Sequence, residues 1–376
     1  MKKTLLALSV AALAAGAGSA QAYNFHIDQT GTDVDFYGSL RVKWESTSNK
    51  TNYVAGGESK EHINHAVDND GSRFGFKLKQ SLGGDFYALG RAEWRMRGEA
   101  PSQHDFDHVY TRQLYAGFGH KQFGELTYGN MTTITDEVTQ SDLANTYSLT
   151  DGLLETSARR VTQYVYNGDY GSNKVKFGAY YGGSSKRNIK NVDLKNNRKN
   201  TWGTGLIFDH EIDSIQNVTV AAGFTREISE NANKTAYYSN AYALGLAYNF
   251  VHTTYGLDFA HKDTKNKDGA GNKVKNNEVT AVIRQGLNED WNVYAMYSYK
   301  TEKTLPVGSA YSKSTDRQFL VGTEYYVYNQ GSLKVKPFLE WQATRTKYEN
   351  TFDKDSGKQL DRSRDFKTVI GLRAYW

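Results

Sequence analysis

The sequence of 376 residues contains no cysteine and only three prolines. Without cysteine it can form neither disulfide bonds nor thiolate metal sites. After residue 22 it also lacks any apolar run near the roughly 18 residues that a membrane-spanning helix needs. These absences leave two classes open, a soluble all-β protein and a membrane β-barrel, because the short alternating strands of a barrel leave little trace in average hydropathy.

A strong excess of one charge is missing too. The chain has 46 Lys and Arg residues and 41 Asp and Glu residues, which gives a formal net charge of +5. Removing a leader that contains Lys2 and Lys3 but no acid lowers this charge from +5 to +3. A dedicated nucleic-acid binder would carry a basic excess on one face, so we expect no nucleic-acid partner.

The first 22 residues have the three parts of a secretory signal peptide. Lys2 and Lys3 are followed by an apolar run over residues 5–15, and then by the small-residue site Ala20-Gln21-Ala22. The alternative is a short buried helix, which would not require this order of parts. We therefore predict that residues 1–22 are cleaved, that the chain is exported through the periplasm, and that residues 23–376 form a single domain.

What the chain does contain is alternation, together with 27 tyrosines and 35 glycines. Residues 34–45, VDFYGSLRVKWE, place apolar side chains on one parity and polar or charged ones on the other. Successive side chains of a strand point to opposite faces, so this segment is a strand with one apolar and one charged face. The same pattern predicts strands at 34–45, 72–79, 86–97, 111–119, 123–131, 161–167, 175–183, 202–209, 218–226, 241–248, 254–262, 277–285, 291–300, 318–328, 333–344 and 364–376.

The connections between these strands alternate in length. Seven are short turns and eight are long polar loops, as in outer-membrane barrels with short periplasmic turns and long external loops. Lipid offers no hydrogen bonds to an open sheet edge, so the last strand should pair with the first and close the barrel. We expect aromatic side chains near strand ends to form interfacial girdles, although a soluble β core would also use aromatics: Trp44, Trp202, Trp291, Tyr325, Trp341, Tyr375 and Trp376. Pro337 inside a strand predicts a local bulge.

Residues 130–160, NMTTITDEVTQSDLANTYSLTDGLLETSARR, form the third long loop and alternate poorly. A structureless segment of this length in a compact domain is usually functional. It carries the acids Asp136, Glu137 and Asp142 and ends on Arg159 and Arg160. We expect the rest of the barrel to be organised around it.

Four segments resemble the general diffusion porins of Gram-negative outer membranes. They are DFYGSLRVKWE at 35–45, GSRFGFKLKQSLGGDFYALGRAEWRM at 71–96, TRQLYAGFGHKQFGELTYGN at 111–130, and IGLRAYW at the carboxyl end. The resemblance implies an all-β fold, a transmembrane antiparallel up-and-down β-barrel of 16 strands in the outer membrane. It also implies a homotrimer in which the third external loop of each barrel folds into the pore.

The resemblance also implies which residues line the constriction. Loop acids would face a basic wall across water, and their opposed charges would set ion preference. The loop acids are Asp136, Glu137 and Asp142; the basic wall is Arg73, Arg112, Arg159 and Arg160, with Arg41, Arg91 and Arg95 as further lumen contributors. The alternative is that the loop acids are merely solvated, or pin the loop to wall arginines. The chain departs from the family where EVTQSD at 137–142 replaces PEFGGD, and where Ser39 stands in place of a common lysine.

The expected function is a water-filled channel for passive diffusion of ions and small hydrophilic solutes, with no cofactor, no metal and no catalysis. Lipid and lipopolysaccharide would surround it, and the basic loop at 186–199 could contact lipopolysaccharide phosphates or simply be solvated. A substrate-specific channel with a saturable site is the alternative, using Tyr294, Met296 and Phe338 on the inward parity. Adhesion or receptor function by the loops is a third class. An enzyme is a further alternative, but four loop histidines have no ordered acidic partner to suggest a metal: His62, His65, His104 and His108.

Overall fold

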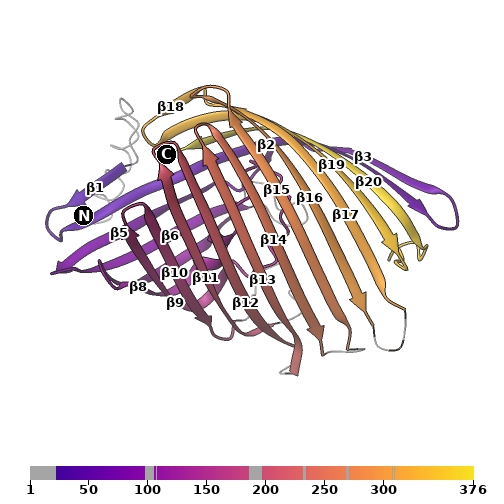
Figure 1. Ribbon diagram of the computed structural model, residues 1–376, viewed down its shortest axis with the longest axis horizontal. Helices are drawn as coiled ribbons and strands as arrows, with labels where there is room; N and C mark the ends of the chain where they lie inside the picture. Colours follow the sequence, from indigo (N-terminus) through magenta and orange to yellow (C-terminus); the bar gives the residue numbers. More distant parts are fainter. Residues whose placement is uncertain are drawn as a thin grey trace.

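The computed structural model describes residues 23–97, 106, 108–185, 197–231, 234–267, 271–306, 308 and 310–376. The predicted signal peptide, residues 1–22, lies outside them. Sixteen antiparallel strands form a closed ring in the order β2, β5 to β17, β19 and β20, and β20 pairs with β2. Figure 1 shows these strands tilted side by side around the barrel, and both views show β2, β20 and β19 running together. The predicted sixteen-stranded barrel and its closure are confirmed.

The ring strands are β2 (Thr32–Tyr53), β5 (Arg73–Gly83), β6 (Phe86–Arg97), β7 (His108–His120), β8 (Gly124–Thr132), β9 (Ser157–Tyr170), β10 (Asn173–Gly182), β11 (Asn197–Asp213), β12 (Gln216–Asn231), β13 (Lys234–Phe250), β14 (Thr253–Asn266), β15 (Lys273–Gly286), β16 (Trp291–Leu305), β17 (Ser312–Tyr325), β19 (Leu333–Glu349) and β20 (Leu360–Tyr375). Short strands add to its rims: β1 (Tyr23–Ile27), β3 (Glu58–Asn64), β4 (Asp68–Asn69) and β18 (Tyr328–Gln330). The loop between β8 and β9 contains a 3-10 helix, η1 (Ile134–Val138).

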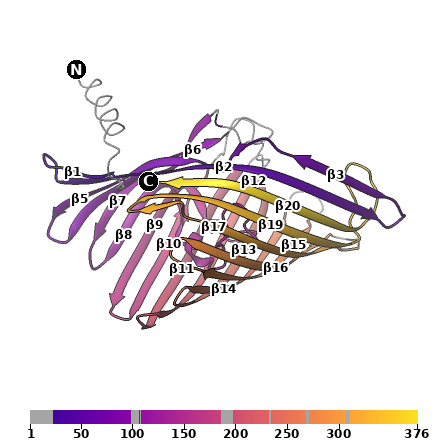
Figure 2. The same cartoon turned by 90° about the horizontal axis from the view of Figure 1, so that it is seen from above.

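Many strands run further than the alternating pattern indicated. β2 extends to Tyr53 and forms a hairpin with β3 inside the expected first long loop. Figure 2 shows β2 running almost the whole length of the molecule, from its turn with β1 to that hairpin. Polar residues such as those at 46–53 can continue a strand outside the lipid, where neither face needs to be apolar.

The two faces of the wall differ as predicted. On β2, Leu40 and Trp44 are exposed, whereas Ser39 and Lys43 on the opposite face are buried. A band of exposed large apolar side chains would be costly in water but is what a lipid-facing surface requires. Among the described residues, no helix is long and apolar enough to cross a membrane.

Two local expectations were wrong. Pro337 causes no bulge, because β19 and β20 pair without a register shift from Lys334 to Lys347. On its other side, β19 pairs with β18 up to Val335 and with β17 from Phe338, so Pro337 occupies a gap in the ladder where no donor is missed. Tyr375 does not join an outer girdle, because its ring lies on the polar face under the Arg41 guanidinium, 5.5 Å from the ring centroid.

Candidate functional site

The loop between β8 and β9 crosses the polar face of the wall from β10 to β20. It begins with η1, whose Ile134 and Val138 are buried against glycines of β10 to β13. Ile134 N–H donates to the side-chain oxygen of Gln163 on β9 at 2.7 Å. The loop is therefore fixed at its start by both apolar contact and a buried hydrogen bond.

Three wall carboxylates accept backbone N–H groups of this loop. Asp258 on β14 accepts from Gln140 N at 2.9 Å and from Ser141 N at 2.7 Å. Glu340 on β19 accepts from three consecutive residues, at 2.5 Å from Asn145, 3.1 Å from Thr146 and 3.0 Å from Tyr147.

The third carboxylate is Glu278 on β15, which accepts from Asp151 N at 2.9 Å. All three carboxylates are at most 6% exposed. Hydrogen bonds to ionised acceptors are stronger than those between neutral groups. The wall therefore holds a segment that has little regular structure of its own.

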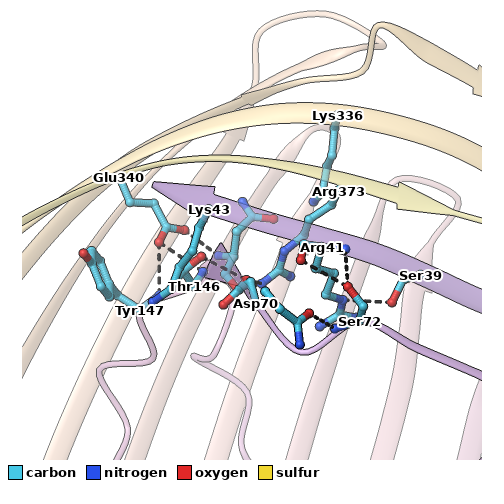
Figure 3. A network of polar contacts seen from close by, with 12 residues as sticks. Ser39, Arg41, Lys43, Asp70, Ser72, Thr146, Tyr147, Lys336, Glu340 and Arg373 are labelled. Atoms are coloured by element: carbon cyan, nitrogen blue, oxygen red, sulfur yellow. Dashed lines mark hydrogen bonds and ion pairs between the residues drawn. The ribbon is translucent and has the colours of Figure 1, made fainter. Parts of the chain in front are cut away.

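The tip of the loop meets the wall at Asn145. Its side-chain amide donates to Tyr294 Oη and to Glu324 Oε2, each at 2.9 Å, and its carbonyl accepts from the Arg373 guanidinium. Thr146 Oγ1 donates to Asp70 Oδ2 at 3.1 Å, and Arg373 pairs with the same carboxylate at 2.8 Å. Figure 3 shows Glu340 from β19, Arg373 from β20 and Asp70 from the segment after β4 converging on this tip.

Apolar side chains support the loop from beneath. Tyr147 and Leu149 pack with Tyr294, Met296 and Phe338 of the wall in one buried cluster. The three wall residues are at most 4% exposed. Because the loop covers them, they cannot form the apolar solute path that a substrate-specific channel would need.

The loop acids fall into two groups. Three of them pair with wall lysines: Glu137 with Lys176 at 2.5 Å, Glu155 with Lys262 at 3.2 Å, and Asp151 with Lys300. Asp136 and Asp142 are exposed and form no salt bridge within the described part of the chain. Of the three acids predicted for the constriction, Glu137 is thus paired with a wall lysine, and the other two have no salt-bridge partner among the described residues.

The surroundings of Asp136 and Asp142 shift their proton affinity. Both side chains reach water, yet protein encloses them, and this partial desolvation raises the pKa of each carboxyl. Arg112 opposes the shift at Asp136, and Arg373 opposes it at Asp142. Each free acid therefore has a wall arginine as an electrostatic partner.

A row of basic side chains crosses five neighbouring strands, and we call it the basic row. Its members are Lys336 on β19, Arg373 on β20, Arg41 on β2, Arg73 on β5 and Arg95 on β6. Arg373 lies opposite Lys336 on one side and Arg41 on the other, and Arg73 lies opposite Arg95. Sequence reasoning found Arg41, Arg73 and Arg95 but missed the two members from β19 and β20.

The members of the basic row differ in how their charge is balanced. Lys336 pairs with Glu324 at 2.6 Å and Arg373 with Asp70 at 2.8 Å. Arg41 donates to the Ser39 hydroxyl at 2.9 Å, and Arg73 Nε is buried without a hydrogen-bond partner. Among the described residues, neither Arg41, Arg73 nor Arg95 forms a salt bridge. Within the basic row, these three are the members whose positive charge no carboxylate balances.

Arg112 and Arg91 have a carboxylate between them. Glu93 on β6 is 1% exposed and pairs with Arg112 at 2.5 Å and with Arg91 at 2.8 Å. Tyr37 Oη adds a hydrogen bond to the same carboxylate at 2.8 Å. A buried acid therefore partly neutralises Arg112, which was predicted for the basic wall, and Arg91, which was predicted as a further lumen contributor.

Arg159 and Arg160 lie at the start of β9, apart from β2 and β5 to β7. Arg160 has φ +53° and donates to the Ser184 carbonyl at 3.4 Å. The Arg159 carbonyl accepts from the Arg198 guanidinium. Their expected place opposite the loop acids stays a prediction.

Several of the loop residues singled out from the sequence lie outside the described residues: Lys186, Arg187, Lys190, Lys195 and His104. Lys199 pairs with Glu230 at 3.0 Å. Within the described ranges, no group of three or more His, Asp or Glu side chains is placed to hold a metal ion.

A closed antiparallel barrel with an apolar outer band and a polar, densely charged opposite face defines the class of outer-membrane β-barrel channels. The family model of the Gram-negative porins matches residues 7–334 of the chain. The chain therefore belongs to the Gram-negative porin family, and it is an outer-membrane porin that forms a channel for diffusion.

Relatives and solved structures agree with this assignment. The chain is 26% identical over 363 residues to a major outer membrane protein of Pasteurella multocida, covering 90% of this chain and 92% of the relative. A second such protein from that organism is 26% identical over the full length of both chains.

Two solved structures share the fold. OmpT of Vibrio cholerae matches with TM-score 0.63 at 17% identity, covering 94% of this chain and 100% of that one. An anion-selective porin from Comamonas acidovorans matches with TM-score 0.62 at 15% identity, covering 92% and 100%.

Proposed function

We propose that the loop of residues 133–156 lies inside the barrel and narrows a water-filled passage for ions and small hydrophilic solutes. The observation that carries this proposal is the position of the three wall carboxylates that accept backbone N–H groups of the loop. Asp258, Glu278 and Glu340 alternate along their strands with exposed apolar residues such as Phe259, Val279 and Leu339. Because lipid covers the apolar face, the opposite face borders the lumen, and a loop bonded to that face is inside.

The charged lining of this passage would set its selectivity. Asp136 and Asp142 carry negative charge on the loop, and Arg41, Arg73 and Arg95 carry positive charge on the wall. Fixed charges of both signs across a narrow aqueous path produce a transverse field that orients polar solutes and excludes apolar ones. Arginine suits the wall because its guanidinium stays charged at any physiological pH.

The remaining parts of the proposal concern assembly and partners. The family, together with a V. cholerae OmpT structure described as a trimer form, supports a homotrimer, in contact with outer-membrane lipid and lipopolysaccharide. We propose that residues 1–22 are cleaved, and we propose no catalytic role. An unheated gel that shows only monomer after mild detergent extraction would contradict the trimer.

Single-channel recording in planar lipid bilayers tests the central proposal. The purified protein is expected to give stepwise, unsaturating conductance in KCl, and liposomes that contain it should admit small sugars but not larger oligosaccharides. Absence of conductance steps would contradict a general diffusion channel. Transport that saturates as the concentration of one particular solute rises would also contradict it.

Acidification should shift ion preference toward anions. Because desolvation raises the pKa of Asp136 and Asp142, both acids take up protons at a higher pH than free carboxyls do, and the loop loses negative charge as pH falls. Reversal potentials in a KCl gradient, measured from pH 7 to pH 4, should show the shift. A D136N/D142N variant should already prefer anions more than the wild type at pH 7, and its reversal potential should change less as pH falls. If the variant responds to pH like the wild type, other groups cause the pH response.

A further inference from the structure

A line of glycines crosses the wall beneath the loop. Five consecutive strands each contribute one, and we call them the glycine track: Gly178 on β10, Gly205 on β11, Gly223 on β12, Gly245 on β13 and Gly256 on β14. Gly205 lies opposite Gly178 on one side and Gly223 on the other. Residues 134–141 of the loop lie directly on this track.

The track is glycine because of space and not because of backbone conformation. None of its five members has a positive φ, so any L-residue could adopt their extended backbone. A glycine in a strand interior often marks the close approach of another backbone. The positions of the loop atoms above each glycine show this approach.

Loop side chains lie above two members. A Cβ on Gly178 would stand 2.9 Å from Ile134 Cβ, and one on Gly223 would stand 2.8 Å from Val138 Cγ2. Backbone carbonyls lie above two others. A Cβ on Gly256 would stand 2.6 Å from the Gln140 carbonyl oxygen, and one on Gly245 would meet the Val138 carbonyl oxygen.

We propose that the glycine track sets the width of the passage. This inference rests on the proposed constriction. One side of the loop contacts β10 to β14, so the passage can lie only on the opposite side of the loop. The deeper residues 134–141 of the loop lie against β10 to β14, the more space remains between them and the three arginines of the basic row without a salt bridge, Arg41, Arg73 and Arg95. The track residues are therefore positions that determine the size of solute admitted, although none of them contacts a solute.

Alanine at a track position should push the loop into the passage. In G178A, the new Cβ would lie 2.9 Å from Ile134 Cβ. The two carbon atoms would need to separate by about 1 Å to reach ordinary contact. We expect G178A and G245A to lower single-channel conductance on the order of tens of per cent and to exclude the larger sugars that the wild type admits. The control is G90A on β6, where the nearest atom to a new Cβ is 3.5 Å away, and conductance should not change.

Rescue separates this role from a general weakening of the barrel. Adding I134G to G178A removes Ile134 Cβ, Cγ1 and Cγ2, the three atoms that the new Cβ meets, so conductance and the sugar size limit should return toward wild type. Adding V138A to G245A should not restore them, because the obstacle there is a backbone oxygen. If G178A alone fails to assemble, the I134G/G178A variant carries the same test through its assembly and conductance.

These conductance measurements distinguish the role of the glycine track from the proposed channel function. Unchanged or increased conductance in G178A and G245A, with the wild type conducting, would overturn the track's role and leave the channel function intact. Equal rescue of both positions, or of neither, would also overturn it. A wild type that does not conduct would instead refute the proposed function itself.

Discussion

Replacing Glu340 with glutamine is expected to release the tip of the loop and widen the passage. The carboxylate is fully buried and accepts N–H groups from Asn145, Thr146 and Tyr147, and its Oε1 accepts the Tyr294 hydroxyl at 2.6 Å. Glutamine keeps the shape but offers one acceptor oxygen and turns an N–H₂ group toward these donors. Leaving a buried donor without its acceptor costs about 1–3 kcal/mol.

The released tip should change both conduction and stability. E340Q is expected to give larger and noisier single-channel conductance, to admit sugars that the wild type excludes, and to dissociate from its assembled form at a lower temperature. E349Q on the same strand is the matched control, because the described contact of Glu349 is one Tyr311 hydroxyl at 3.2 Å. If E340Q conducts like the wild type, the tip is held by Arg373 and the apolar cluster without Glu340.

The barrel itself was predictable because each strand follows one rule. A residue such as Trp44 must face lipid and its neighbour Lys43 must not, whichever strands lie beside them. Alternation over 34–45 therefore predicts a strand, and because lipid offers no hydrogen bonds to an open sheet edge, the strands are predicted to close. The strand ends were less predictable, because outside the lipid the rule no longer applies, as the polar extension of β2 to Tyr53 shows.

The position of the loop depended on long-range contacts. Gln140 and Asp258 are 118 residues apart, and Asn145 and Glu340 are 195 residues apart, so no local pattern joins them. A signal for the anchors was present nonetheless. Asp258, Glu278 and Glu340 are acids on the inward parity of their strands, and a carboxylate that becomes buried needs donors.

Parity and resemblance found the wall arginines but not their charge balance. Glu93 lies within β6, two residues from Arg91 and Arg95. Whether it pairs with Arg112 on β7 depends on the register there, which shifts between Glu93 and Trp94. A register shift of this kind follows from local backbone geometry that the alternating pattern does not record.

Replacing Arg73 with glutamine is expected to shift ion preference strongly toward cations without weakening the barrel. Arg73 has no salt bridge among the described residues and its Nε is unpaired; its charged neighbours include one acid, Glu93, and three arginines, Arg112, Arg95 and Arg373. Removing one charge from a cluster of like charges relieves repulsion. The assembled form of R73Q should therefore be at least as heat-resistant as the wild type.

The size of the selectivity change follows from Coulomb's law. A unit charge about 8 Å from a passing ion contributes roughly 0.5 kcal/mol in water, attractive for anions and repulsive for cations. Its removal changes the cation-to-anion permeability ratio about fivefold at low salt, and about twofold near 0.1 M because of screening. Reversal potentials in KCl gradients of different absolute concentration should show both values.

The R112Q variant is the comparison for R73Q, because Arg112 has a salt bridge and Arg73 has none. R112Q removes the same charge but leaves Glu93, which is 1% exposed, with Arg91 as its remaining salt-bridge partner. Loss of one partner from a buried pair costs about 3–5 kcal/mol, so R112Q should shift selectivity in the same direction and lower the temperature of dissociation. Equal heat resistance in both variants would mean that Glu93 is not held by Arg112, and an unchanged reversal potential in R73Q would remove Arg73 from the lining of the passage.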